Sequence, residues 1–367
     1  MTADQREAAV WERAVLHLDM DAFFVNVHLL DHPEDEGVPL AVGGRPEGRG
    51  VVASASYEAR RFGVRSAMPA ARALRLCPQI KFVGRDWSRI RACSREVMAI
   101  LRDYGPVEQL SVDEAYVDVS DHGDPADLAQ VIRERVQAET GLPTSVGLAQ
   151  NKLVAKVASD HDKPEGCTVV RPGEEAGFLE ALSVRVIWGI GPRTAERLAL
   201  MGISTCGELA AADPVALELE FGDQGASLQR RARGEDSRPV EAERGPPKSI
   251  SQERTFNEDV DDPVFLREKL QSMSEGVAVS LQKQGLIAHT VFVKFRWADF
   301  TTFTRQRTVE VGMDEAEAIA HQALTIWEEH WPPGQKVRLL GVGVSKLEEP
   351  VARQLDLFGR LDFEGSD

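Results

Sequence analysis

Two short clusters of carboxylates lie within otherwise apolar stretches of this chain. They are Leu18-Asp19-Met20-Asp21-Ala22-Phe23-Phe24 and, much further along, Ser111-Val112-Asp113-Glu114-Ala115-Tyr116, and neither contains a lysine or an arginine. A buried charge is costly unless a counter-charge meets it, and hard divalent cations, above all Mg²⁺, prefer oxygen ligands. Together the clusters predict a two-metal site for phosphoryl transfer, although either carboxylate alone would more simply cap a strand or face water.

Side chains that suit a triphosphate lie further along the chain. Ser54 and Tyr57 carry hydroxyls, and Arg60 lies one helical turn after Tyr57, on the same face of an expected helix. An arginine matches phosphate oxygens bidentately. Lys163, in the turn 162–166, is a further candidate phosphate contact. Each of these residues, standing alone, would be an ordinary solvated position.

The elements expected to position the acidic clusters are strands. Residues 14–24 predict a buried strand with a helix beginning at its end, and residues 108–111 and 115–120 alternate like two antiparallel strands. If these strands are neighbours, three carboxylates meet at one edge of the sheet: Asp19, Asp113 and Glu114. Asp21 would share the face of Asp19 only if the strand continued that far, so we expect a structural role for it.

The order of the expected elements divides the chain into regions. A length of 367 residues suits about two to four domains. A mixed α+β region ends near residues 176–182, and an all-helical segment follows to about residue 240. After a proline-rich stretch at 238–247, the remaining elements follow a β-α-β-β-α-β order, the ferredoxin-like arrangement, and a short tail ends the chain.

Composition favours a soluble, cytoplasmic protein. The chain has no apolar run of the roughly 18 residues needed to span a membrane, and its polar, acidic start lacks the features of a signal peptide. The four cysteines are scattered without a Cys-x-x-Cys pair, which favours reduced thiols over a zinc site or disulfides. A net charge of −16 weakens a nucleic-acid hypothesis without excluding it, because acidic and basic residues are grouped in separate segments.

In their order and spacing these motifs resemble those of the Y-family DNA polymerases, and most of all the bacterial DNA polymerase IV branch. The resemblance covers nearly the whole chain and rests on Leu18–Phe24, Ser56–Val64, Ser111–Tyr116, Asn151-Lys152, Ala155–Ser159 and Lys163–Gly166. The chain departs from the family pattern at Val25–His28, where small residues and a glutamate are usual. It also departs at Ala149–Asn151, which lacks the usual serine.

The resemblance implies an α+β, multidomain right-hand fold arranged around a primer–template. Its expected parts are a ferredoxin-like palm (1–22 and 86–176), small fingers (23–85), a helical thumb with a helix-hairpin-helix (177–240), a linker (241–247), a β-α-β-β-α-β little finger (248–348) and a tail with a clamp-binding motif (349–367).

The resemblance also assigns roles residue by residue. Asp19, Asp113 and Glu114, with the Met20 carbonyl, match the ligands of two Mg²⁺ ions per active site, for which Mn²⁺ can substitute. The positions that match the nucleotide site are Phe23, Phe24, Ser54, Tyr57, Arg60 and Lys163. Among these, Phe24 matches the steric gate, an aromatic ring with which a ribose 2′-OH would clash, so that deoxynucleotides are selected.

Contacts to DNA and to a partner are expected in the second half of the chain. Residues 187–198 have the form of a helix-hairpin-helix, whose glycines permit a tight turn with N–H groups facing a phosphate. Two later strands alternate basic and apolar residues, so one basic face is expected to lie against DNA. The candidate DNA contacts are Gly189, Gly191, Arg193, Lys294, Arg296, Arg305 and Arg307. The segment Gln354-Leu355-Asp356-Leu357-Phe358 resembles the pentapeptide that docks bacterial polymerases to the sliding clamp, with Gln354, Leu355, Leu357 and Phe358 as its contacts.

The function implied is template-directed, translesion DNA synthesis of low processivity and without proofreading, by a monomer that adds dNTPs to a primer 3′-OH and releases pyrophosphate. One alternative is a catalytically silent, clamp-associated DNA-binding adaptor, against which the retained carboxylates speak. A second is a metal-dependent nuclease, in which Phe24, Tyr57 and Arg60 have no obvious role. A nucleotidyltransferase that inserts one base regardless of template stays open within the same class.

Overall fold

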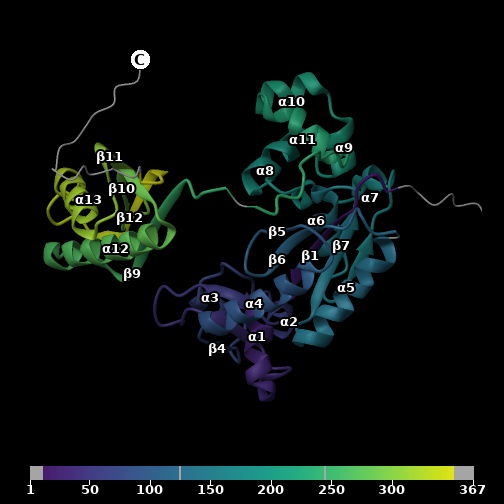
Figure 1. Cartoon of the computed structure of the whole chain (residues 1–367), viewed down its shortest axis with the longest axis horizontal. Coiled ribbons are helices and arrows are strands. Elements are labelled where there is room, and N and C mark those ends of the chain that lie inside the picture. The colour runs from purple at the N-terminus through teal and green to yellow at the C-terminus, as the bar shows by residue number, and fades with distance from the viewer. Residues whose placement is uncertain (1–10, 124, 244, 351–367) are drawn as a thin grey trace, which may run out of the picture. The chain divides into compact units, whose positions relative to one another are not determined.

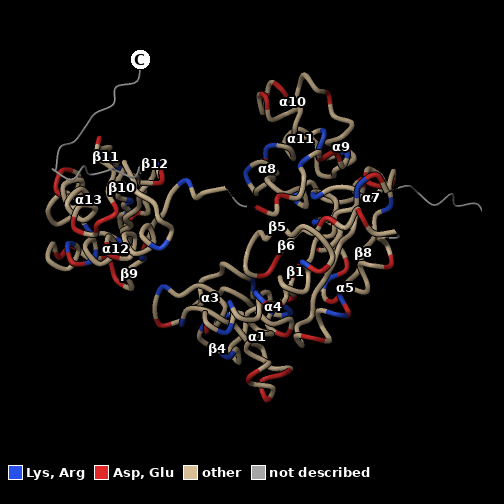
Figure 2. Tube along the Cα trace, in the orientation of Figure 1, with Lys and Arg blue, Asp and Glu red and all other residues tan. Residues whose placement is uncertain are grey.

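The computed structural model describes residues 11–123, 125–243 and 245–350 and has the expected mixed α+β composition (Figure 1). It divides into two compact units, Met1–Arg244 and Gly245–Asp367. The boundary between them falls inside the stretch 241–247, which the sequence predicts to be a linker. Figure 2 shows lysines and arginines interspersed with acidic residues along both units.

The first unit is built on a five-stranded sheet with the order β5-β6-β1-β7-β8. Its strands are β1 (Val15–Met20), β5 (Val107–Gln109), β6 (Glu114–Asp118), β7 (Thr144–Ala149) and β8 (Cys167–Val169). β1 is central and pairs antiparallel with β6 and β7, and only β7 and β8 pair in parallel. The expected pair of antiparallel strands on either side of Asp113-Glu114 is confirmed as β5 and β6.

The two faces of this sheet have different surroundings because side chains alternate along a strand. Leu16, Leu18 and Met20 pack with helices α4 (Trp87–Arg102) and α5 (Pro125–Thr140) in one core. Val15, on the opposite face, packs with α6 (Lys152–His161) in another core. Asp19 therefore lies on the α6 side of the sheet, near the C-terminal end of β1.

The order of strands and helices β1-α4-β5-β6-α5-β7 makes this sheet ferredoxin-like, since its first strand lies inside and pairs with the third and fourth. A smaller sheet, with the order β3-β2-β4, is inserted between β1 and α4. It is formed by β2 (Leu40–Gly43), β3 (Val52–Ala55) and β4 (Lys81–Val83), and has its own small core. The helices of this insertion are α1 (Phe23–Asp31), the short 3₁₀ helix η1 (Pro33–Asp35), α2 (Tyr57–Arg61) and α3 (Ala70–Leu76).

The segment from 175 to 232 is helical; the expected helical segment is thus confirmed, although its last helix ends at Ala232 and not near residue 240. It contains α7 (Glu175–Glu180), the 3₁₀ helix η2 (Val184–Val186), α8 (Pro192–Leu200), α9 (Cys206–Ala211), α10 (Pro214–Phe221) and α11 (Gln224–Ala232). Helices α8 to α11 form a cluster of their own (Figure 1). Its apolar side chains, among them Leu198, Leu209 and Leu228, share a core with those of α6.

The second unit has the expected β-α-β-β-α-β connectivity. Its elements are β9 (Ser249–Val260), α12 (Pro263–Gln284), β10 (Ile287–Trp297), β11 (Thr302–Met313), α13 (Ala316–His330) and β12 (Val337–Glu348). The sheet order is β11-β10-β12-β9, so the first strand lies at an edge. The expected ferredoxin-like strand order is therefore wrong for this unit, although it holds for the first. Both helices pack on one face of the sheet.

Helices that could cross a lipid bilayer were sought among the described residues, and none is both long and apolar enough.

Candidate active site

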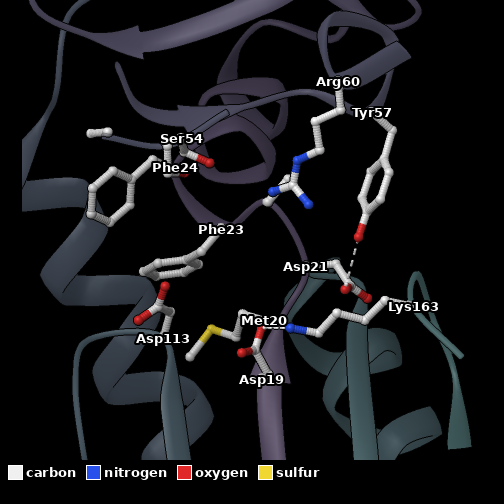
Figure 3. Close-up of a pocket in the computed structure, with 13 residues that line it drawn as sticks. Asp19, Met20, Asp21, Phe23, Phe24, Ser54, Tyr57, Arg60, Asp113 and Lys163 are labelled. Carbon is white, nitrogen blue, oxygen red and sulfur yellow. Dashed lines mark hydrogen bonds and ion pairs between the residues drawn. The ribbon is translucent and has the colours of Figure 1, made fainter. Parts of the chain in front are cut away.

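A pocket of about 120 Å³ opens where the end of β1 meets α1, β3, α2 and the turn before β8 (Figure 3). It brings together most of the residues that the sequence singles out for the metal and the nucleotide. Its lining consists of Asp19, Met20, Asp21, Ala22, Phe23, Phe24, Ala53, Ser54, Tyr57, Arg60, Ser66, Asp113 and Lys163.

The backbone at the end of β1 sets the geometry of the acidic residues. Asp19 is the register partner of Glu114 on β6, so the two Cβ atoms share a face about 4.5–5.5 Å apart. The Met20 N–H donates to the Asp113 carbonyl at 2.9 Å, which fixes the loop before β6 beside β1. Ala22 then adopts a left-handed conformation, with φ 42°, and begins the turn into α1.

Asp19 is paired with a lysine in this structure. Lys163 Nζ lies 2.7 Å from Asp19 Oδ1 and 2.7 Å from Asp160 Oδ1. Burial raises the pKa of Asp19 to about 6, although the Lys163 ammonium opposes the shift. Burial alone would lower the pKa of Lys163, but Asp19 and Asp160 outweigh it and raise that pKa. A partly buried carboxylate of this kind requires a cation beside it.

Asp113 is positioned by a turn that the side chain of Ser111 closes. The Ser111 hydroxyl donates to Asp113 Oδ1, and Ser111 Oγ accepts from the N–H groups of Asp113 and Glu114, each at 3.1 Å. The Ser111 carbonyl in turn accepts from Gln109 at 2.8 Å. The Asp113 side chain lines the pocket opposite Asp19 (Figure 3).

Glu114 directs its carboxylate elsewhere. Its Oε2 is paired with Lys156 Nζ and lies 3.5 Å from His17 Nε2, and it lines a different pocket. The contact with His17, followed by that with Lys156, lowers the pKa of Glu114 to about 2, while burial lowers the pKa of His17 to about 4. Strand pairing thus brings Asp19, Asp113 and Glu114 together along the backbone, but only Asp19 and Asp113 face the same space.

The oxygen donors of the pocket suit a hard divalent cation. Asp19 and Asp113 are carboxylates, Met20 also lines the pocket, and burial makes a cation beside Asp19 favourable. Over residues 11–123, 125–243 and 245–350, no three His, Cys, Asp or Glu side chains are grouped closely enough to hold a metal ion as they stand. A full set of three carboxylates therefore requires Glu114 to leave Lys156 and His17.

Another side of the pocket is formed by residues of β3 and α2. Arg60 Nε donates to the Ala55 carbonyl at 3.0 Å, and its guanidinium lies 4.6 Å from the centre of the Tyr57 ring. This leaves its terminal nitrogens directed into the pocket (Figure 3). The Tyr57 hydroxyl donates to Asp21 Oδ1 at 3.3 Å. Together with Ser54 and Lys163, these groups are the donors that a triphosphate requires.

Phe24 lies at the wall of the pocket, half-buried. Its ring contacts Phe23, with centroids 5.8 Å apart, and the ring of Trp87 at 5.7 Å in an edge-on arrangement. Phe23 itself is buried and belongs to the core beneath the sheet. Trp87 therefore supports the Phe24 ring from the start of α4 and fixes its position.

Sequence reasoning missed three residues of this region. Ser66 lines the pocket from the loop after α2, Trp87 supports Phe24, and Lys156 binds Glu114. Only Lys156 had a usable signal, because it lies within Ala155–Ser159, one of the motifs on which the family resemblance rests. Nothing local to residues 66 or 87 connects them to the acidic clusters.

The glycine-rich turn before α8 lies between the short 3₁₀ helix η2 and α8. Gly189 has φ 96°, a conformation that favours glycine, and Gly191 is the residue that precedes the first turn of α8. Ile187 and Ile190 are buried beneath the turn, whereas Gly189, Gly191 and Arg193 are exposed. This helix N-terminus is therefore open to an anion.

The basic residues of the second unit do not share one face. Lys294 and Arg296 pair with threonines of β11 on the face that the helices leave open, whereas Arg305 and Arg307 lie opposite buried valines of β10. Arg307 accordingly reaches Glu329 of α13 at 2.6 Å. The expectation of one face with four basic residues is wrong, because the alternation within each strand does not fix the register between strands.

The proposed clamp contacts Gln354, Leu355, Leu357 and Phe358 lie outside the described residues.

Comparison with known proteins adds independent findings. Models of the impB/mucB/samB family and of its C-terminal domain match residues 18–160 and 247–357. The chain is 42% identical to a DNA polymerase IV of Halorhodospira halophila, over 95% of this chain and 99% of that one. It is 44% identical to a DNA polymerase IV of Methanoculleus marisnigri, over 94% and 97% of the two chains.

A solved structure resembles the whole fold as well. The Y-family DNA polymerase chimera Dbh-Dpo4(243-245)-Dbh superposes with a TM-score of 0.81 at 26% identity, over 92% of this chain and all of the chimera. Family models, relatives and structure agree, and this chain belongs to the impB/mucB/samB family, within the Y-family DNA polymerases.

Proposed function

We propose that this chain extends a primer on a DNA template, adding dNTPs to the primer 3′-OH and releasing pyrophosphate. The observation that carries the proposal is the pocket in which Asp19 and Asp113 face the same space as Tyr57, Arg60 and Lys163. Carboxylates hold hard divalent cations, and cationic and hydroxyl donors hold phosphates. One pocket thus has the two kinds of group that nucleotidyl transfer requires.

The broad class of enzyme follows from the family. The chain is a DNA-directed DNA polymerase of the translesion type, which acts on DNA and dNTPs and depends on divalent metal. The alternative of a catalytically silent adaptor is not favoured, since the relatives are named as polymerases and the acidic residues are present. Low processivity and the lack of proofreading belong to the proposal.

In this mechanism Asp19, Asp113, Glu114 and the Met20 carbonyl would hold two Mg²⁺ ions. Bound there, the ions would supply a lowered pKa at the attacking hydroxyl and neutralise charge on the departing phosphates. To act as ligands, Glu114 would have to leave Lys156, and Asp19 would have to leave Lys163. The Lys163 ammonium, once released, is free to bind the triphosphate.

The remaining residues of the pocket orient the nucleotide. Ser54, Tyr57, Arg60 and Lys163 bind the triphosphate through hydroxyl and cationic donors. Phe24, backed by Trp87 and adjoining Phe23, packs against the sugar and clashes with a ribose 2′-OH.

The domain roles extend the proposal along the chain. The palm comprises residues 1–22 and 86–176, the fingers 23–85, the thumb 177–240, and the little finger 248–348. Support comes from the arrangement of the five-stranded sheet, the inserted small sheet, the helical cluster and the second unit. Duplex contacts are proposed for the glycine turn before α8 and for Lys294 and Arg296 on the open sheet face. We further expect the protein to be a cytoplasmic monomer. Light scattering would measure its molar mass and so its oligomeric state.

Primer extension with Mg²⁺ on an undamaged template tests the proposal. We expect template-matched addition by the wild type and none by Asp113→Ala/Glu114→Ala. The matched control is Asp127→Ala/Glu134→Ala, which removes two exposed carboxylates of α5 and should leave extension intact. A folded, DNA-binding wild type that adds no nucleotide, or adds nucleotides regardless of template, would overturn the proposal.

Clamp docking through Gln354–Phe358 is a separate part of the proposal. Removal of residues 351–367 should abolish stimulation by a bacterial sliding clamp without changing distributive synthesis, because a docking segment raises the local concentration of enzyme at the primer end. Equal stimulation of the full and shortened chains would contradict it.

A further inference from the structure

Asp21 is a buried carboxylate in the lining of the pocket for which the proposed mechanism has no use. Only 2% of the residue is exposed, and it lies just beyond the last residue of β1. Its backbone N–H donates to the Pro143 carbonyl at 3.0 Å, and its own carbonyl accepts from the Asn26 side chain at 2.5 Å. The backbone therefore holds the Asp21 carboxylate at a fixed place between the palm and α2.

Three donors reach this carboxylate, and their distances differ. Oδ2 accepts from Ser145 Oγ and from the Glu165 N–H, both at 2.8 Å, whereas Oδ1 accepts from the Tyr57 hydroxyl at 3.3 Å. Hydrogen bonds between oxygens are shortest and strongest near about 2.7–2.8 Å. Ser145 and Glu165 thus fix the carboxylate. The longer bond from Tyr57, drawn as a dashed line in Figure 3, is the one that breaks most easily.

Tyr57 has a single proton to donate. Burial, and then the charge of Asp21, raises the pKa of Tyr57 to about 12, so the phenol keeps its proton at neutral pH. Phosphate oxygens of a triphosphate only accept hydrogen bonds, and a phenol donates only one. The Asp21 carboxylate and an incoming triphosphate therefore compete for the same hydroxyl proton.

We propose that Asp21 holds the Tyr57 hydroxyl while the nucleotide site is empty and yields it to the triphosphate, so that this competition sets nucleotide affinity. The inference rests on the proposed function, because it takes a dNTP as the ligand. Asp21 is accordingly a residue that positions Tyr57 and does not itself touch the substrate.

The substitution Asp21→Asn keeps the hydrogen bonds that fix the side chain at position 21 but removes the acceptor of the Tyr57 hydroxyl. The amide oxygen can still accept from Ser145 and Glu165, which turns the NH₂ group toward the Tyr57 oxygen as a donor. Tyr57 then has its proton free for the triphosphate. Because one net hydrogen bond is recovered on binding, the KM for dNTP should fall by about two- to tenfold.

The test is single-nucleotide incorporation at saturating primer–template, with KM and kcat measured separately. We expect Asp21→Asn to lower the KM for dNTP and Tyr57→Phe to raise it. In the Tyr57→Phe background, Asp21→Asn should no longer change KM. If Asp21→Asn unfolds, Asp21→Ser, whose side chain is too short to reach Tyr57, should lower KM in the same way.

Asp160→Asn is the matched control for charge. This substitution removes a carboxylate that is paired with Lys163 but leaves the Tyr57–Asp21 hydrogen bond in place. Any effect of Asp160→Asn on KM should therefore persist in the Tyr57→Phe background. The proposal is overturned if Asp21→Asn leaves KM unchanged or raises it, or if its effect survives in Tyr57→Phe. A wild type without any nucleotide incorporation would instead count against the proposed function itself.

Discussion

Gly147 on β7 lies directly against the backbone of helix α6, and Gly147→Ala tests how that contact supports the site. A Cβ atom at this position would lie 2.2 Å from the Ala155 carbonyl oxygen and 2.3 Å from the Ser159 N–H nitrogen. Both are backbone atoms of α6, so no side-chain rotation can relieve the clash. The helix would have to move by about 1 Å to restore ordinary contact.

The expected cost follows from this geometry. Overpacking of a core costs about 1–3 kcal/mol, and obstruction by backbone atoms places Gly147→Ala near the upper value. For a unit of this size, about 3 kcal/mol corresponds to a fall in Tm of about 6–12 °C. Displacement of α6 also moves Lys156 and Ser159, which contact Glu114 and His17, so primer extension should slow even well below Tm.

Thermal unfolding followed by circular dichroism measures this effect. The control is Gly84→Ala, since a Cβ atom added at Gly84 would meet no heavy atom within 4 Å and the residue has no positive φ; this substitution should leave Tm unchanged or raise it slightly. If Gly147→Ala melts together with the wild type, α6 does not pack this closely on β7, and the account of how Lys156 is positioned would be refuted.

Three further predictions address the gate, the buried histidine and the DNA face. Phe24→Leu should raise ribonucleotide incorporation relative to deoxynucleotide by about tenfold or more, and single-nucleotide kinetics with unchanged sugar discrimination would contradict the gate. Burial lowers the pKa of His17 from 6.5 to about 4, so its neutral form contributes up to about 3 kcal/mol of stability above pH 6.5, and this contribution is lost as the pH falls toward 4. The free energy of unfolding of His17→Gln, measured in urea, should not show this loss. Lys294→Ala/Arg296→Ala should reduce the slope of log binding constant against log salt concentration by the equivalent of about two phosphate contacts. An equal reduction from Arg305→Ala/Arg307→Ala, on the opposite face, would argue against the open face as the DNA-binding surface.

The sequence predicted which segments form strands and helices better than it predicted which strands pair with one another. Hydrophobic periodicity and turn residues were sufficient for the β-α-β-β-α-β order of the second unit, because both are local properties. They did not reveal that β9 lies at an edge and β12 inside, since that choice depends on contacts between distant strands. The same limit explains Arg305 and Arg307, whose alternation was recognised but whose register with β10 was not.

The acidic site shows a similar division. Carboxylates within apolar runs indicated the strand ends correctly, and β1 and β6 do place Asp19 opposite Glu114. The partner that Glu114 binds, Lys156, comes from a helix on another part of the chain. A long, flexible side chain can reach several groups, so a pattern along the sequence predicts its neighbourhood but not its partner.

The two sides of the pocket belong to sheets of very different size. Asp19 lies on β1, which is paired on both sides within five strands, whereas Ser54 lies on β3, an edge strand of a three-stranded sheet. Local opening within one protein ranges from nearly free to as costly as global unfolding. Amide hydrogens of β3 should therefore exchange with solvent well before those of β1. On mild heating the enzyme would lose nucleotide binding first, while the strand pairing that positions the carboxylates stays intact. Early inactivation should therefore be reversible on cooling.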